Sequence, residues 1–522
     1  MSQGTDGARA GLSSVTRGTL VMMLGTLGYV AESFVSRVIL VRTLSPALWS
    51  QFSLAIALGG LVTAFGALGL PSAIARCLPY EPADPERRRI VRTAFVVGGP
   101  AALAFAAALA IFSVPVSTTY HAPVFGMTLL FFAVAVAFNI TAGLIASIFQ
   151  GYEDVVPNAL YIQVLNPALF IAFLLGAERL GPSGTAYLGV LIAYVIAAAA
   201  SFVALVLYAR LRLPRFLPEG PRVPGVSRKL LYFAAPLFLV GVLSYLSNNG
   251  DTLVLGAINR SAVGYYSAEL SLSRLLQVGI GSLGYIILPV TTRFVRTGDT
   301  GAARVTYATA TKWMALASLP LFLLFFFLPV ASLAFVYGAA YAAPPLALEI
   351  LVLGAFVSTL VGPAQPAQVA YGQTRLLFYN TAVAAVVDVG LALWLTPTYG
   401  LTGASVAWAV SGALLPVLSL TELALFSGVH PFARHYVVPL VVTAAPVGVL
   451  MAVIPYGLPL VALPVIGLGI AGLFILAVVM SGSIDEGDRL LLEVVEGLLR
   501  RPVPLVRRLE RLSRRFRRDG GR

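Results

Sequence analysis

Long apolar runs separated by short polar segments fill almost the whole chain. A helix needs roughly 20 apolar residues to cross a bilayer, and by run length we predict fourteen such spans. The pattern therefore predicts an all-α polytopic membrane protein. The predicted spans are Gly18–Val41, Ser50–Leu70, Thr93–Val114, Val124–Phe149, Ala159–Ala177, Thr185–Tyr208, Leu230–Val254, Ala262–Val290, Val305–Val330, Leu346–Ala370, Leu376–Leu395, Leu401–Phe426, Tyr436–Ile454 and Leu458–Met480.

Short motifs recur in the same order at an offset of 214 to 221 residues. The offset covers six predicted spans, and an even number gives both copies the same orientation, as in parallel repeats of transporters. The matched pairs are Gln51–Ala55 with Tyr265–Glu269, Leu70–Pro71 with Leu288–Pro289, Gln150–Gly151 with Tyr371–Gly372, and Leu180–Ala186 with Tyr399–Ser405.

The repeat predicts two six-helix lobes, at 17–209 and 229–427. A cytoplasmic tail, 1–16, precedes them, and a cytoplasmic linker, 210–228, joins them. The last two spans, within 428–480, lie outside the repeat, and a basic tail follows at 481–522.

Composition agrees with the membrane class. The chain is 58% hydrophobic and 11% charged, with a mean hydropathy of +0.89, whereas a soluble domain carries about 25% charged residues. The net charge of +13 looks at first like a nucleic-acid signal, but 30 of the 35 Lys and Arg, Lys312 among them, are assigned to one side of the predicted topology. The positive-inside rule then places both termini in the cytoplasm of a multi-pass cell-membrane protein, and we expect no nucleic-acid partner.

Motifs for enzyme chemistry are missing from the sequence. The one cysteine, Cys77, excludes an internal disulfide, and His121, His430 and His435 lack the spacing of metal ligands. There is no Walker A motif, and no arrangement typical of a hydrolase or metalloprotease. We expect no catalytic residues, no metal site and no cofactor.

Charged and polar residues inside the predicted spans are the candidate functional residues. A charge at the bilayer centre costs roughly 2.5–3.5 kcal/mol, so such residues face a protein interior or a wet cavity. Two parallel lobes imply a central cavity with the substrate near the midplane. The residues predicted to line it are Glu32, Arg37, Asn248, Asn249, Asp251, Glu269, Arg274, Gln277 and Asp388.

Arg37 and Arg274 are the sharpest candidates. Arginine stays charged and grips phosphate oxygens with two parallel hydrogen bonds, so we expect these residues to bind a phosphate or diphosphate headgroup. The alternative is that Glu32, Glu269 or Asp388 neutralises them in buried ion pairs. Asp251, Glu269 and Asp388 are candidates for a coupling-ion site, and the sequence does not decide between a proton and sodium.

The tail ends in a basic amphipathic pattern. Leu505, Leu509, Leu512 and Phe516 share one helical face, and arginines surround them. This spacing favours a helix lying on the anionic cytoplasmic leaflet. The alternative is a partly disordered, solvated tail.

Several motifs resemble one transporter family. Arg42–Ser53, Leu68–Pro71 with Arg76, Asp251–Gly256, Val263–Tyr266, Tyr371–Thr374 and Tyr399–Gly403 are similar to segments of polysaccharide and oligosaccharide flippases. These belong to the multidrug/oligosaccharidyl-lipid/polysaccharide exporter superfamily. The resemblance covers about 17–480 and implies two six-helix lobes with a cationic central cavity, followed by two helices that form a groove for a lipid tail.

The resemblance also implies a function. The expected activity is to flip a polyprenyl- or dolichyl-(di)phosphate-linked oligosaccharide from the cytoplasmic to the outer leaflet by alternating access, for surface polysaccharide or glycoprotein assembly. Its expected partners are that lipid-linked substrate, anionic membrane lipids and glycan assembly enzymes, and we expect a monomer. The alternatives are an ion-coupled multidrug exporter of the same superfamily, for which twelve helices are usual, and a non-transporting scaffold of a glycan assembly complex.

Overall fold

The computed structural model describes residues 25–119, 123–180, 186–213, 225–342 and 345–432, together with short pieces between 436 and 473. Helices make up nearly all of this described part of the chain, and it contains no strand. The chain divides into two compact units: one spans Val21–Ser267, and the other begins at Ala268. We call them the N-terminal unit and the C-terminal unit.

The N-terminal unit starts with a helix over 25–43. Its further elements are α2 (Pro46–Gly66), α3 (Leu70–Cys77), α4 (Asp84–Thr93), η1 (Ala94–Gly98), α5 (Gly99–Thr119), α6 (Pro123–Gly151), η2 (Asn158–Leu165), α7 (Asn166–Leu180), α8 (Ala186–Arg212), α9 (Arg228–Ile258), η4 (Arg260–Ala262) and the first turn of α10 (Val263–Leu275).

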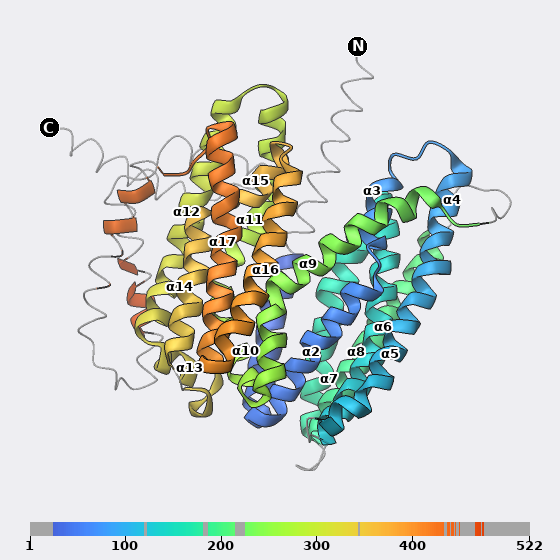
Figure 1. Ribbon diagram of the computed structural model, residues 1–522, viewed down its shortest axis with the longest axis horizontal. Coiled ribbons are helices and arrows are strands. Elements are labelled where there is room, and N and C mark those ends of the chain that lie inside the picture. The colour runs from blue at the N-terminus through green and yellow to red at the C-terminus, as the bar shows by residue number, and fades with distance from the viewer. Residues whose placement is uncertain are drawn as a thin grey trace. The chain divides into compact units, whose positions relative to one another are not determined.

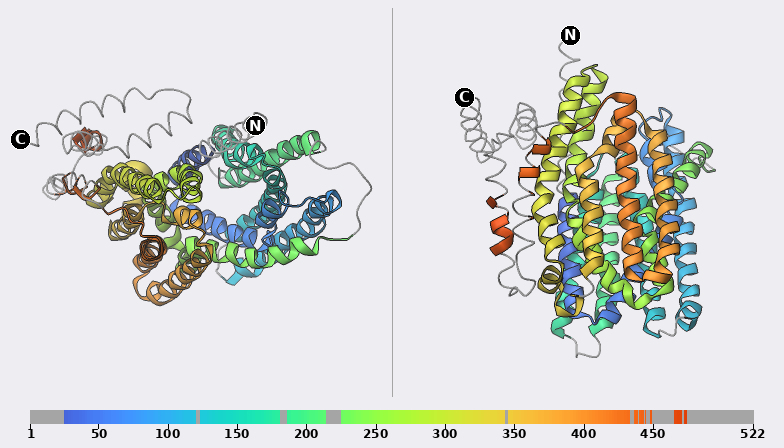
Figure 2. Two further views of the ribbon diagram at one scale, coloured as in Figure 1. Left: turned by 90° about the horizontal axis from the view of Figure 1, so that it is seen from above. Right: turned by 60° about the vertical axis from the view of Figure 1, so that its left-hand side comes forward.

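The long helices of this unit pack side by side, with α6 against α2, α5 and α8 (Figures 1 and 2). Aromatic rings fill the space between them. The ring of Phe52 on α2 lies 5.3 Å from that of Phe132 and 5.8 Å from that of Tyr194, in edge-to-face arrangements between centroids. Such pairs add to the stabilisation from apolar burial.

Helix α9 and the start of α10 are held to α2 by hydrogen bonds. The Trp49 indole donates to Gly264 O at 3.0 Å, and the Tyr245 hydroxyl donates to Ala57 O at 2.6 Å. Ser53 and Ser267, which the repeat pairs with each other, share a hydrogen bond of 3.0 Å between their hydroxyls. The seventh predicted span thus makes its contacts within the N-terminal unit, although the repeat assigns it to the second lobe. A helix can belong to one sequence repeat and still pack with helices of the other. The lobe boundaries therefore stay a prediction.

The C-terminal unit contains the rest of α10, then α11 (Val278–Arg296), α12 (Thr300–Phe327), α13 (Pro329–Tyr337), η5 (Ala339–Tyr341), α14 (Pro345–Val361), α15 (Ala364–Ala370), α16 (Thr374–Tyr399) and α17 (Leu401–Ser427). Here α17 packs against α14, α15 and α16, while α12 packs against α11 and α14 (Figure 1).

The predicted all-helical membrane architecture is confirmed. Among the described residues, ten helices are long and apolar enough to cross a membrane, and each coincides with one of the predicted spans. Of the first predicted span, 25–41 is helical, while the last two spans are described only in short pieces. The N-terminal tail, most of the linker and the basic C-terminal tail lie outside the described residues.

Two features differ from the sequence-based expectation. The predicted span Ala262–Val290 is interrupted: α10 ends at Leu275 and α11 begins at Val278. Lys312, counted with the cytoplasmic residues, lies inside α12 with only 1% of its surface exposed. Each difference concerns only one or two residues within an apolar run, and run length alone does not resolve such details.

Candidate functional site

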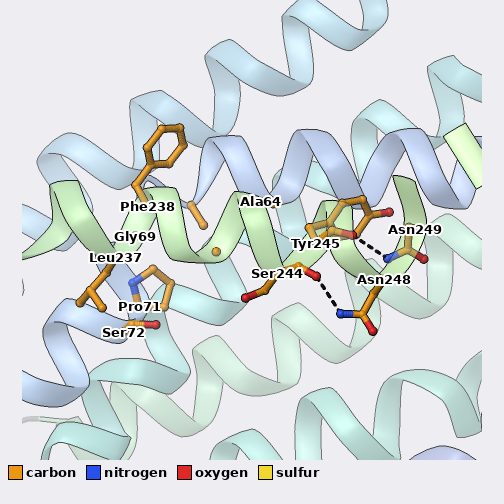
Figure 3. Close-up of a pocket in the computed structure, with 12 residues that line it drawn as sticks. Ala64, Gly69, Pro71, Ser72, Leu237, Phe238, Ser244, Tyr245, Asn248 and Asn249 are labelled. Carbon is orange, nitrogen blue, oxygen red and sulfur yellow. Dashed lines mark hydrogen bonds between the residues drawn. The ribbon is translucent and has the colours of Figure 1, made fainter. Parts of the chain in front are cut away.

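A pocket of about 360 Å³ opens in the N-terminal unit between α2, α3 and α9 (Figure 3). Its walls are partly apolar, with Ala64, Leu237 and Phe238 among them. Its polar side chains are uncharged, and four of the five come from α9. They are Ser72, Ser244, Tyr245, Asn248 and Asn249.

The polar face of α9 follows from helical spacing. Leu237, Gly241, Ser244 and Asn248 line the pocket at steps of three or four residues, so they share one face of the helix. The Asn248 side-chain amide donates to Ser244 O at 2.7 Å, and that of Asn249 donates to Tyr245 O at 3.3 Å (Figure 3). Each amide thereby satisfies a donor within its own helix.

The turn before α3 forms the end of the pocket. Gly69 has φ +68°, and a side-chain carbon there would overlap the carbonyl of Ala234 and the amide of Phe238 on α9. Only glycine combines this backbone conformation with so close an approach. The Leu68–Pro71 motif therefore brings α3 against α9 and sets the width of the pocket.

A group of polar contacts fixes the beginning of α9; we call Glu81, Glu86, Ser227 and Lys229 the latch. The Lys229 ammonium lies 2.7 Å from the Glu81 carboxylate, and the Ser227 hydroxyl donates to Glu86. Ser227 also caps α9 by accepting from Leu230 N at 3.2 Å. The Lys229 ammonium, which donates to the Glu81 carboxylate, holds the pKa of the Glu81 carboxyl below its usual value. The latch ties α4 and the segment before it to the beginning of α9.

The other predicted cavity residues of the N-terminal unit do not line this pocket. Glu32 and Arg37 lie half-buried on the helix over 25–43. Asp251 is fully buried and accepts a hydrogen bond from the Tyr266 hydroxyl. This contact joins α9 to the start of α10.

In the C-terminal unit, Arg274 and Gln277 flank the break between α10 and α11. Both side chains are half-buried. At this break, Gln277 N donates to Arg274 O at 3.0 Å, which is the bond of a tight turn. Thr359 on α14 donates to Leu276 O at 3.4 Å. The N-terminus of α11 therefore lies within one turn of Arg274, and a helix N-terminus carries a partial positive charge.

Two acidic residues of this unit are buried in different surroundings. Glu269 is 1% exposed, and neither of its carboxylate oxygens has a hydrogen bond. Asp388 on α16 is fully buried and accepts from the Ser411 hydroxyl at 2.8 Å. Among the described residues, no group of three or more His, Cys, Asp or Glu is placed to hold a metal ion.

Of the nine predicted residues, the described pocket thus contains Asn248 and Asn249. Sequence reasoning missed Ser72, Ser244 and Tyr245, although their helical spacing from Asn248 was a usable signal for the last two. It also missed Lys312 as an intramembrane cation, which its place in the apolar run Val305–Val330 indicated. The pocket can hydrogen-bond a neutral, hydroxyl-rich ligand, because it offers amide oxygens and hydroxyls beside apolar surface.

Comparison with known proteins identifies the relatives of this chain. Residues 15–295 match a family described as "Polysaccharide biosynthesis protein". A search of curated proteins found no match.

Three solved structures share the fold. A lipid II flippase, MurJ, in an inward closed conformation aligns with a TM-score of 0.66 at 14% identity, covering 87% of this chain and 98% of its own. An inward-facing multidrug resistance MATE family transporter of the MOP superfamily has a TM-score of 0.58 at 16% identity, with 77% and 96% covered. A crystal structure of MATE in complex with MaD5 gives 0.55 at 15% identity, with 78% and 93% covered.

Proposed function

We propose that this chain, which belongs to the polysaccharide biosynthesis protein family, is a flippase for a lipid-linked oligosaccharide. Its substrate is a polyprenyl- or dolichyl-(di)phosphate-linked sugar chain that moves from the cytoplasmic to the outer leaflet by alternating access. Both termini then lie in the cytoplasm, as the positive-inside rule expects.

The observation that carries the proposal is the row of uncharged polar side chains that α9 contributes to this pocket. Sugar hydroxyls cannot enter hydrocarbon without hydrogen-bond partners, because each unsatisfied group costs several kcal/mol. Asn248, Asn249 and Ser244 offer such partners on a membrane-spanning helix. We assign this face to the sugar, while the lipid tail stays in the bilayer.

Arg274 is the candidate for the phosphate. It lies one turn before the N-terminus of α11, so the guanidinium and the helix dipole both favour an anion there. Discontinuous helices commonly bind anionic substrates in transporters. Arg37 is the matching candidate in the N-terminal unit, and the coupling ion, a proton or sodium, stays open.

A host lacking this gene tests the proposal. We expect lipid-linked oligosaccharide to accumulate in the cytoplasmic leaflet, where an impermeant sugar-oxidising probe does not reach it. The native gene should restore exposure to the probe, and the double variant Asn248→Ala/Asn249→Ala should not. Thr421→Val is the control, since Thr421 is an exposed polar residue of α17 that bonds its own helix. Unchanged lipid-linked sugar on both faces, in a host with no second flippase, would reject the proposal.

The second candidate is an ion-coupled multidrug exporter, which the fold shared with a MATE family transporter favours. Uptake of radiolabelled cationic drugs into inverted vesicles separates the two. Drug uptake that the Asn248→Ala/Asn249→Ala variant abolishes, with no effect on lipid-linked sugar, would establish the exporter instead.

A further inference from the structure

Helices α15, α16 and α17 pack against one another in the C-terminal unit and are labelled in Figure 1. A polar cluster lies between them. We call Gln368, Asn380 and Glu422 the Glu422 cluster. The side-chain amide of Gln368 donates to Glu422 Oε2, and that of Asn380 donates to the same oxygen at 2.7 Å. Gln368 is fully buried, and Asn380 is 5% exposed. Three helices thus direct polar groups at one carboxylate.

The Glu422 carboxylate is half-buried on α17. None of the ion pairs between described residues involves Glu422. A partly buried carboxylate is stabilised by a positive partner, since burial raises the cost of an uncompensated charge.

Three side-chain oxygens on α15 and in the turn that follows it have no hydrogen-bond donor. Gln368 Oε1, Tyr371 Oη and Gln373 Oε1 are buried and have no hydrogen bond. The amide nitrogen of Gln368 donates to Glu422, so the oxygen of the same amide lies close to the carboxylate. Gln373 folds back onto α15, because its backbone amide donates to Gln368 O at 2.9 Å. Buried acceptors of this kind call for a partner.

The donor set indicates the class of that partner. It consists of one carboxylate and the amide oxygen of Gln368, and such oxygens are ligands for hard cations. A single carboxylate balances a single positive charge. We propose that the Glu422 cluster, with the free oxygen of Gln368, binds a monovalent alkali cation that bridges α15, α16 and α17. The proposal goes beyond the flippase function, since it does not depend on the substrate.

Cation-dependent stability of the purified full-length protein tests this site. We would measure the thermal unfolding midpoint in NaCl, KCl and choline chloride at constant ionic strength. A saturable increase in Na⁺ or K⁺ over choline is expected, because a ligand that binds only the folded state stabilises it. Glu422→Gln should weaken the apparent affinity at least about tenfold, as expected for loss of a charged ligand worth roughly 1.4 kcal/mol or more. Glu349→Gln, another half-buried carboxyl of the same unit, should leave it unchanged.

A second variant keeps the test decisive if Glu422→Gln does not fold. Asn380→Asp removes an amide donor from Glu422 and adds a second carboxylate, so we expect a lower midpoint in choline and a larger cation-dependent gain, with Ca²⁺ now effective. Equal midpoints in all three salts, or a Na⁺ or K⁺ effect that survives Glu422→Gln, would overturn the proposal. The buried oxygens would then be satisfied by water alone.

Discussion

At the scale of single residues, Gly69 shows how a sequence motif sets the geometry of the pocket. Its φ of +68° and its contact with the α9 backbone both exclude a side chain. Gly69→Ala should therefore lower the free energy of unfolding by roughly 1–3 kcal/mol through backbone strain, with a further loss from overlap with α9. The measurement is the thermal unfolding midpoint of the purified protein.

Gly225→Ala is the matched control for Gly69→Ala. Gly225 has φ +85°, but nothing lies within 4 Å of a side-chain carbon placed there. This variant carries the backbone strain without the overlap, so it should lose less stability. Equal losses in the two variants would show that the approach of Gly69 to α9 contributes nothing.

Arg274 carries the second prediction at this scale. If its guanidinium binds the substrate phosphate, Arg274→Ala removes charged hydrogen bonds worth about 1.5–3 kcal/mol, and flipping should slow by about tenfold to a hundredfold. Arg274→Lys should restore only part of the rate, because lysine lacks the bidentate fork. Arg296→Ala, at the exposed far end of α11, is the control. Normal flipping by Arg274→Ala at normal expression would show that Arg274 does not bind the substrate phosphate.

At the scale of elements, the latch links α4 and the segment before it to the beginning of α9. Because the pKa of Glu81 is lowered in the folded protein, its contribution to stability is present above the usual carboxyl pKa and is lost as the pH falls through the lowered value. The unfolding midpoint of the native protein should exceed that of Glu81→Gln at pH 7, and the difference should vanish in acid.

A surface ion pair provides the comparison for the latch. Asp84 and Arg87 lie 3.9 Å apart with 59% and 32% of their side chains exposed, so Asp84→Asn should change the midpoint little at any pH. A difference between the native protein and Glu81→Gln that does not depend on pH would contradict the assigned ion pair with Lys229.

Tyr245 connects α9 to α2 and tests how that contact holds the pocket. Tyr245→Phe removes the hydrogen bond to Ala57 O, at 2.6 Å, and should destabilise the protein by about 0.5–1.5 kcal/mol. Tyr232→Phe is the control, because Tyr232 lies on the same helix with 80% of its surface exposed. An equal effect of both variants on the unfolding midpoint would argue against a role of the Ala57 bond.

Apolar run length was sufficient to predict the positions of ten membrane helices, because the cost of exposing backbone in hydrocarbon forces each run into a helix. It was insufficient for the break between Leu275 and Val278, where the sequence has no proline and where Thr359 on α14 donates to Leu276 O. Asn248 and Asn249 lie in the pocket, but their role in binding stays a prediction. Asp251 and Glu269 are buried elsewhere, and composition does not distinguish a cavity wall from a helix contact.

At the scale of the whole molecule, two compact units of membrane-spanning helices carry the candidate chemistry separately. The N-terminal unit holds an uncharged polar pocket, and the C-terminal unit holds a helix break beside Arg274 and the Glu422 cluster. This division suits a substrate with a hydroxyl-rich part and an anionic part.

Flipping by the purified protein tests this central claim most directly. The protein is reconstituted into vesicles containing a polyprenyl-diphosphate oligosaccharide, and an impermeant sugar-oxidising probe measures how much of it reaches the outer leaflet over time. We predict rapid access to the whole pool, slowed in both Asn248→Ala/Asn249→Ala and Arg274→Ala. Access that never exceeds the outer-leaflet share in protein-free vesicles, with the protein folded and monodisperse, would contradict the account.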